Sequence, residues 1–103
     1  MFTAKKQEVY LKGYKTIESG TFKDEDGRDV PFDGYKQIIL SVMNKNNEFV
    51  DVKCRIPNTS EYEQLYAKFI QTPLMTRLLV DVEIQISKSG TAKYFLTNME
   101  IAK

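Results

Sequence analysis

The sequence predicts an all-β domain with one helix, in the order strand, strand, strand, helix, strand, strand. Two segments, Phe49–Ile56 and Leu78–Ile86, alternate apolar and polar residues at the period of a half-buried β-strand. Only Thr59–Pro73 has apolar residues at the spacing of one helical face. Asn, Ser, Gly and Lys cluster between strand-like segments, as hairpin turns require. Because strands joined by short turns leave exposed edges unless they close on one another, we expect a barrel with the helix at one end.

The first strand is expected to be the longest. Residues Val9–Lys23 are rich in Thr, Tyr, Val and Ile, and Gly13 and Gly20 interrupt them where a bulge or a bend would fit. A long strand bent at glycine suits a small closed barrel. The face of each residue stays open, because one bulge reverses the alternation. Residues 1–7 are expected to form a flexible N-terminal arm.

The second and third strands are expected to form a hairpin after a turn-rich, acidic loop over Asp24–Gly34. Asn44–Asn47 supplies residues that tolerate left-handed backbone and predicts the hairpin turn. In the strand Tyr35–Met43, one face carries Ile38, Leu40 and Val42, and the other carries Tyr35, Gln37, Ile39, Ser41 and Met43. In the strand Phe49–Ile56, the expected inward residues are Val50, Val52, Cys54 and Ile56, and the outward residues are Phe49, Asp51, Lys53 and Arg55.

The helix is predicted with defined ends. Ser60 and Glu63 match a capping box, in which each side chain satisfies a backbone N–H of the other residue. Pro73 lacks an N–H and disfavours helix at Thr72, so the helix is expected to end there. The helix should pack on the sheet through one apolar face made of Tyr62, Leu65, Tyr66, Phe69 and Ile70.

Two strands follow the helix and are expected to pair through the turn Ser87–Thr91. In Leu78–Ile86, the expected inward residues are Leu78, Val80, Val82, Ile84 and Ile86. In Tyr94–Ile101, Tyr94 is expected to face outward, and the inner face is expected to hold Phe95, Thr97, Met99 and Ile101.

With this layout, the chain resembles the small OB-fold single-stranded DNA-binding proteins of phages and conjugative mobile elements. The resemblance is carried by the hairpin Tyr35–Ile56, the helix Ser60–Ile70, and the closing hairpin Leu78–Lys103 with its basic tip Lys88-Ser89-Gly90. It implies a five-stranded OB-fold-like barrel over residues 1–103. It also implies a role in coating single strands during DNA replication, recombination or transfer, and self-association as a homodimer, for which an exposed Ile39 and Leu79 would leave room.

A nucleic-acid site is expected on the outward face of the second and third strands. Single-strand binders hold the backbone with basic side chains and stack bases on aromatic rings, and an OB-fold uses this face with the loops after its first and fourth strands. The candidates on this face are Tyr35, Gln37, Phe49, Lys53 and Arg55, and the closing hairpin adds Lys88, Lys93 and Tyr94. Tyr14 extends the site if its ring faces outward, and packs in the core otherwise. Exposed aromatic residues on strands also suit cross-sheet packing or a dimer contact.

The composition argues against catalysis. The chain has no histidine, so Ser-His-Asp triads, Cys-His pairs and histidine metal sites are absent. Cys54 lies in an inward set and is expected to be a small core residue. The acids around Gly27 resemble a calcium loop, but the twelfth position counted from Asp24 is Tyr35 rather than a glutamate. We therefore expect a binding protein without enzyme activity, cofactor or metal.

The overall charge leaves a second hypothesis open. The 103 residues carry a net charge of +1, so binding to single-stranded DNA or RNA must depend on where the charges lie. A small OB-like protein–protein interaction module, with its partner at the acidic loop Asp24–Asp29, fits the same sequence. So does an SH3-like barrel with the helix outside. The single cysteine, the lack of a long apolar run and the lack of a signal-peptide pattern favour a cytoplasmic protein with no membrane contact.

Overall fold

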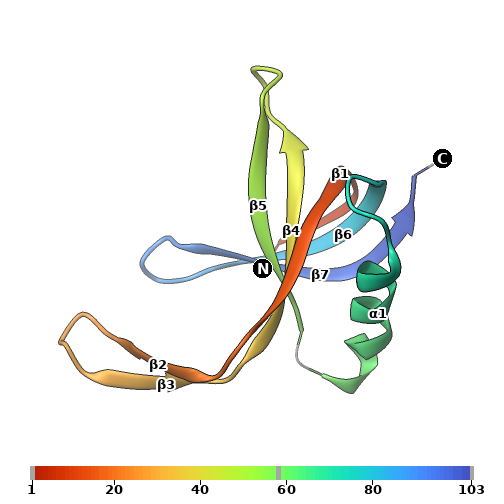
Figure 1. Cartoon of the computed structure of the whole chain (residues 1–103). Coiled ribbons are helices and arrows are strands. Elements are labelled where there is room, and N and C mark those ends of the chain that lie inside the picture. Colours follow the sequence, from red (N-terminus) through yellow and green to blue (C-terminus); the bar gives the residue numbers. More distant parts are fainter. Residues whose placement is uncertain (1, 58, 103) are drawn as a thin grey trace.

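The computed structural model describes residues 2–57 and 59–102, and five of its strands hydrogen-bond in a closed ring. Around the ring the order is β1-β4-β5-β7-β6, and β6 pairs with β1 again. The prediction of a mostly β protein with one α-helix is confirmed. The elements in chain order are β1 (Phe2–Ile17), β2 (Gly20–Lys23), β3 (Asp29–Phe32), β4 (Tyr35–Met43), β5 (Phe49–Ile56), the 3₁₀ turn η1 (Ser60–Tyr62), α1 (Glu63–Gln71), β6 (Arg77–Ile86) and β7 (Ala92–Ile101) (Figure 1).

The long strand β1 makes ring closure possible, because it pairs antiparallel with both β4 and β6. Its register shifts between Leu11 and Gly13, so the bulge expected near Gly13 is present. The ring closes on the other side through a parallel pairing of β5 with β7, at Arg55 opposite Phe95. In chain order β5 and β7 are the third and fifth strands of the ring, and this short parallel contact brings them side by side.

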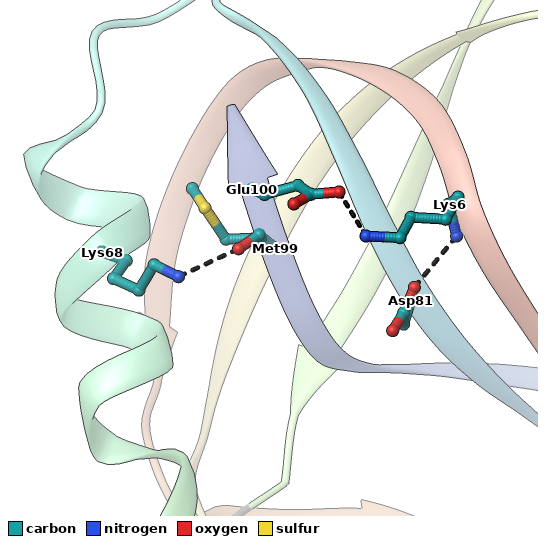
Figure 2. Close-up of polar contacts among 5 residues, drawn as sticks. All are labelled: Lys6, Lys68, Asp81, Met99 and Glu100. Atoms are coloured by element: carbon teal, nitrogen blue, oxygen red, sulfur yellow. Dashed lines mark hydrogen bonds and ion pairs between the residues drawn. The ribbon is translucent and has the colours of Figure 1, made fainter. Parts of the chain in front are cut away.

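The N-terminal residues 2–7 belong to β1, so the expected flexible arm is wrong for the described residues; Met1 lies outside them. Phe2 lies opposite Ile84, and Ala4 lies opposite Val82. Lys6 has a positive φ of 54° at the register shift in β1, and its backbone N–H donates to Asp81 Oδ1 at 2.9 Å. The Lys6 ammonium group also donates to Glu100 Oε1 of β7 (Figure 2), and this hydrogen bond raises the pKa of Lys6. These contacts hold the start of the chain on the ring.

Residues Asp24–Gly34, expected to be a loop, contain a strand. β2 and β3 form a two-stranded hairpin outside the ring, with Phe22 opposite Val30, and β1 ends before it at Ile17. At its tip, Asp24 Oδ1 accepts hydrogen bonds from the backbone N–H groups of Asp26 and Arg28, both at 2.9 Å. The hairpin projects away from the ring, as does the β6–β7 hairpin (Figure 1). Both hairpins extend on the same side of the molecule.

The helix begins later than predicted. Ser60 lies in the 3₁₀ turn, α1 starts at Glu63, and neither start has a side-chain cap, so the expected capping box is absent. The predicted end holds, because Thr72 is extended and Pro73 follows. Leu65 and Phe69 are buried against the strands, Tyr62 and Tyr66 pack partly against the same core, and Ile70 is exposed. The Lys68 ammonium group donates to the Met99 carbonyl at 2.9 Å and attaches the helix to β7 (Figure 2).

The inner face of β7 differs from the prediction. The register with β6 shifts between Asp81 and Val82: Val82 lies opposite Leu96, and Asp81 lies opposite Asn98. Thr97 is therefore an extra residue that reverses the alternation. Leu96 and Met99 are fully buried, whereas Ile101 is exposed. Before the bulge, Phe95 lies on the outer face.

The core fills the ring with side chains from every strand of it and from α1. Its members include Leu11, Ile38, Cys54, Phe69 and Leu96. The inward residues predicted at the far ends of the hairpins, Val50 and Ile86, are exposed because those ends extend beyond the core. No helix in the described ranges has the length and apolar character needed to cross a membrane.

Candidate nucleic-acid interface

A groove of about 500 Å³ lies where the two projecting hairpins meet the ring. Its walls come from β2–β3, from the start of β4, and from β5 and β7. The aromatic residues that line it are Phe22, Phe32, Tyr35 and Phe95. The charged residues that line it are Asp33, Arg55 and Lys93. The groove thus joins aromatic rings with two cations on the outer face of the sheet.

The strand register brings the predicted residues Tyr35 and Arg55 together. Directly opposed residues of paired strands share a face, and Arg55 lies opposite both Gln37 and Phe95. The Arg55 guanidinium carbon lies 4.0 Å from the centre of the Tyr35 ring, a cation–π contact. Arg55 has no carboxylate partner among the described ion pairs. Its charge therefore remains available to a ligand.

Of the predicted lysines, Lys93 lines the groove, whereas Lys53 and Lys88 lie outside its lining. Lys93 lines the groove from β7, where it lies opposite Gln85. Lys88 is exposed in the turn between β6 and β7, where Gly90 has a φ of 85°. Lys53 is exposed on β5, opposite Ile39, two residues along the strand from Arg55. These cations follow one side of the outer face, from β5 to the tip of the β6–β7 hairpin.

Three aromatic residues of the groove were not predicted from the sequence. The Phe22 and Phe32 rings lie 6.3 Å apart, tilted by 44°, on the β2–β3 hairpin. Each lies five residues from Gly27 in the acidic turn. This symmetric spacing is the signal from which a hairpin could have been predicted. Phe95 was assigned to the core because the bulge at Thr97 leaves no mark in the sequence. Without these residues the site would have a single groove aromatic, Tyr35.

Phe49 lies at the other end of the outer face. It is six residues from Arg55 along β5, or about 20 Å at about 3.3 Å per residue. Its ring is 5.7 Å from the Tyr10 ring at 81°, an edge-to-face pair, and is 56% exposed. Beside this pair, the Lys12 ammonium group binds the Asp51 carboxylate at 2.8 Å. The structure therefore does not bring Phe49 into the groove.

Tyr94 and Tyr14 lie on the inner side of the sheet. Tyr94 lies opposite Ile84 and packs against the core, so its predicted outward orientation is wrong. The bulge at Thr97, which reverses the alternation, is the cause here as it is for Phe95. Tyr14 lies opposite the fully buried Ile38, but it is 43% exposed and does not belong to the core. Neither ring belongs to the groove.

Gln37 shares the outer face of Arg55 but is buried, with only 8% exposure. Lys15 and Arg55 lie directly opposite it on the two neighbouring strands. Its Oε1 atom has no hydrogen-bond partner among the described residues. A ligand reaches this atom only if neighbouring side chains move.

Acidic residues gather on the β2–β3 hairpin. Lys23–Asp29 contains four acids and two bases, so its net charge is −2. One pair is internal, because Lys23 binds Asp29 at 3.0 Å. In the part of the chain that the structure describes, no three His, Cys, Asp or Glu side chains are grouped as metal ligands. The acidic tip therefore differs in charge from the basic β6–β7 tip across the groove.

Cys54 is buried in the core, as predicted, beneath the outer face. Burial raises the pKa of its thiol to about 12. A thiol with this pKa is a poor nucleophile near neutral pH.

Comparisons of the chain with protein-family models, with curated proteins and with solved structures return no match. The groove is the feature of the described residues that bears on function.

Proposed function

We propose that the protein binds single-stranded DNA with little overall sequence preference through the groove between its two hairpins. The observation that carries the proposal is the combination, in one groove, of Phe22, Phe32, Tyr35 and Phe95 with the cations Arg55 and Lys93. Bases stack on aromatic rings for roughly 1 to 3 kcal/mol each, and cations hold the phosphates.

We propose further that the ring is an OB-fold. Two features support this proposal: β1 pairs with both β4 and β6, and the helix lies in the chain between β5 and β6. An OB-fold is a five-stranded, partly open Greek-key barrel that binds ligands on its second and third strands and on the loops after its first and fourth strands. In this chain the corresponding parts are β4, β5 and the β2–β3 and β6–β7 hairpins, which are the parts that form the groove.

Under this proposal the protein coats single strands during replication, recombination or transfer of phage or mobile-element DNA, in the cytoplasm and without catalysis. Self-association as a homodimer belongs to the same proposal. Ile39 and Leu79, expected to be available for it, are both half-buried within one copy.

Tyrosine fluorescence offers a direct test, because the chain has six tyrosines and no tryptophan. A poly-pyrimidine oligonucleotide should quench the emission at low salt, salt should reverse the quenching, and duplex DNA should have little effect. The salt reversal follows from the release of counterions when cations neutralise phosphates. If the folded protein shows no response to single strands at low salt, the proposal fails.

The acidic hairpin tip favours a second candidate, a protein-interaction module with a basic partner. The net charge of −2 over Lys23–Asp29 repels phosphates and attracts cations. Co-purification of a partner that survives nuclease treatment and is lost with Asp24→Asn and Asp26→Asn would favour this candidate. A DNA-mediated association would disappear with nuclease.

A further inference from the structure

The two walls of the groove differ in chemistry, and this difference would orient a strand bound as proposed above. The β2–β3 side presents Phe22 and Phe32, with acids beyond them at the hairpin tip. The opposite side presents Arg55 and Lys93, together with the rings of Tyr35 and Phe95 next to Arg55. Phosphates are attracted to the cationic wall and repelled from the acidic hairpin, so the backbone of a strand lies toward Arg55 and Lys93. Its bases then turn toward Phe22 and Phe32.

Asp33 lines the groove between the end of β3 and the start of β4. Of the described residues that line the groove, it is the one with a carboxylate. Within the same described residues, its carboxylate takes part in no hydrogen bond or ion pair. It is separate from the acids at the hairpin tip, of which Asp24 accepts hydrogen bonds in the turn and Asp29 pairs with Lys23.

The backbone on both sides of Asp33 is fixed. On one side, Phe32 pairs with Gly20 at the base of the hairpin. On the other side, a Cβ atom on Gly34 would lie 2.7 Å from the Ile17 carbonyl oxygen, so the chain approaches β1 too closely for any residue but glycine. Asp33 is therefore held at the anchored base of the hairpin rather than on its projecting end.

An ionised carboxylate accepts hydrogen bonds and donates none. Cytosine offers an N4 amino group to such an acceptor, whereas thymine offers the acceptor O4 at the same position. A single strand leaves these base edges free to be read. From this complementarity we infer that the groove selects a base bearing an amino group, cytosine among the pyrimidines, through Asp33. The inference rests on the proposed function and adds a preference at one base to binding that is otherwise tolerant of sequence.

The test compares deoxycytidine and deoxythymidine homopolymers of about ten residues, a length within the usual site size. Tyrosine quenching near neutral pH gives the affinity of the wild-type protein for each. Asp33→Asn keeps the size of the side chain but adds an amide nitrogen, which can donate a hydrogen bond to thymine O4. Asp26→Asn is the matched control, because it removes the same charge from the hairpin tip, where Asp26 is exposed.

We expect the wild-type protein to bind the cytosine strand at least about fivefold more tightly, which lies within the usual discrimination of one base contact. Asp33→Asn should bring the ratio close to one, and Asp26→Asn should leave it unchanged while raising both affinities through the lost repulsion. Equal affinities in the wild-type protein, or a ratio that survives Asp33→Asn, would overturn the inference and leave single-strand binding intact. Absence of binding to both strands would overturn the proposed function and the inference with it.

Discussion

The outer face of β4 and β5 has aromatic rings at both ends, but only one end has the surroundings of a binding site. At the β4–β5 hairpin, Phe49 packs edge-to-face on Tyr10, and the nearby Lys12 is paired with Asp51. At the groove, Arg55 lies over Tyr35, and both Arg55 and Lys93 lack a carboxylate partner among the described ion pairs. The exposure of Phe49 is higher than that of Tyr35. We therefore place the proposed site by unpaired charge beside a ring rather than by exposure of the ring.

The largest expected effect comes from removing the two groove cations together. Arg55→Ala with Lys93→Ala should weaken single-strand binding roughly a hundredfold, because a hydrogen bond to a charged group contributes about 1.5 kcal/mol or more. The slope of log affinity against log salt should also decrease in magnitude by about 1.4, because each phosphate contact that is lost accounts for about 0.7. Lys5→Ala with Lys45→Ala removes the same charge away from the groove and should change affinity far less. Equal losses in the two double variants would mean that the net charge, and not the groove, holds the strand.

A smaller loss is expected for a groove aromatic residue. Phe22→Ala should weaken binding about tenfold, because it removes one stacking surface worth about 1 to 3 kcal/mol. Since Phe22 is half exposed, the melting temperature should change little. Unaltered affinity in the folded variant would remove the β2–β3 hairpin from the site.

At the opposite end, Phe49→Ala should affect stability rather than binding. Loss of the edge-to-face pair with Tyr10 should lower the free energy of unfolding by about 0.5 to 1.5 kcal/mol. Affinity for a single strand should stay within about twofold, as for a surface change away from the site. Denaturant unfolding and fluorescence titration of the same preparation measure both quantities. A tenfold loss of affinity here would extend the site along the full length of β5.

Cys54 lies on β5 between the two ends and reports whether any of these variants is still folded. Because burial raises the pKa of its thiol from 9.0 to about 12, iodoacetamide should label it very slowly in the native protein near pH 8. The raised pKa also means that stability is lost as pH rises from 9.0 toward about 12, since the unfolded thiol ionises first. Fast labelling of a variant in buffer would show that its binding defect is a folding defect. Fast labelling of the wild-type protein would contradict the burial of Cys54.

Strand bounds could be predicted from the sequence where apolar and polar residues alternate without a bulge. The predicted bounds of β4 and β5 agree with the structure, and the turns at Asn44–Asn47 and Ser87–Thr91 were found from residues that favour left-handed backbone. The inner face of β7 was missed because the extra residue Thr97 depends on pairing with β6, which no local pattern reveals. The capping box failed because Ser60 lies in a 3₁₀ turn that precedes the α-helix.

The candidate site was predicted in part for the same reasons. Tyr35, Arg55 and Lys93 were named from alternation and charge, and the structure brings them together. Phe22 and Phe32 were missed because β2 and β3 were read as the end of a strand and a loop. Phe49 was included because alternation gives the face of a residue but not its distance along the strand from the other members.

The groove is tested most directly by crosslinking. A single-stranded oligonucleotide with photoreactive 5-iodopyrimidines can be irradiated with the protein, and the attached peptides identified by mass spectrometry. We predict attachment at Phe22, Phe32, Tyr35 or Phe95, lost in the presence of excess unmodified single strand. Attachment confined to Tyr10 and Phe49 would contradict the account and move the site to the β4–β5 hairpin.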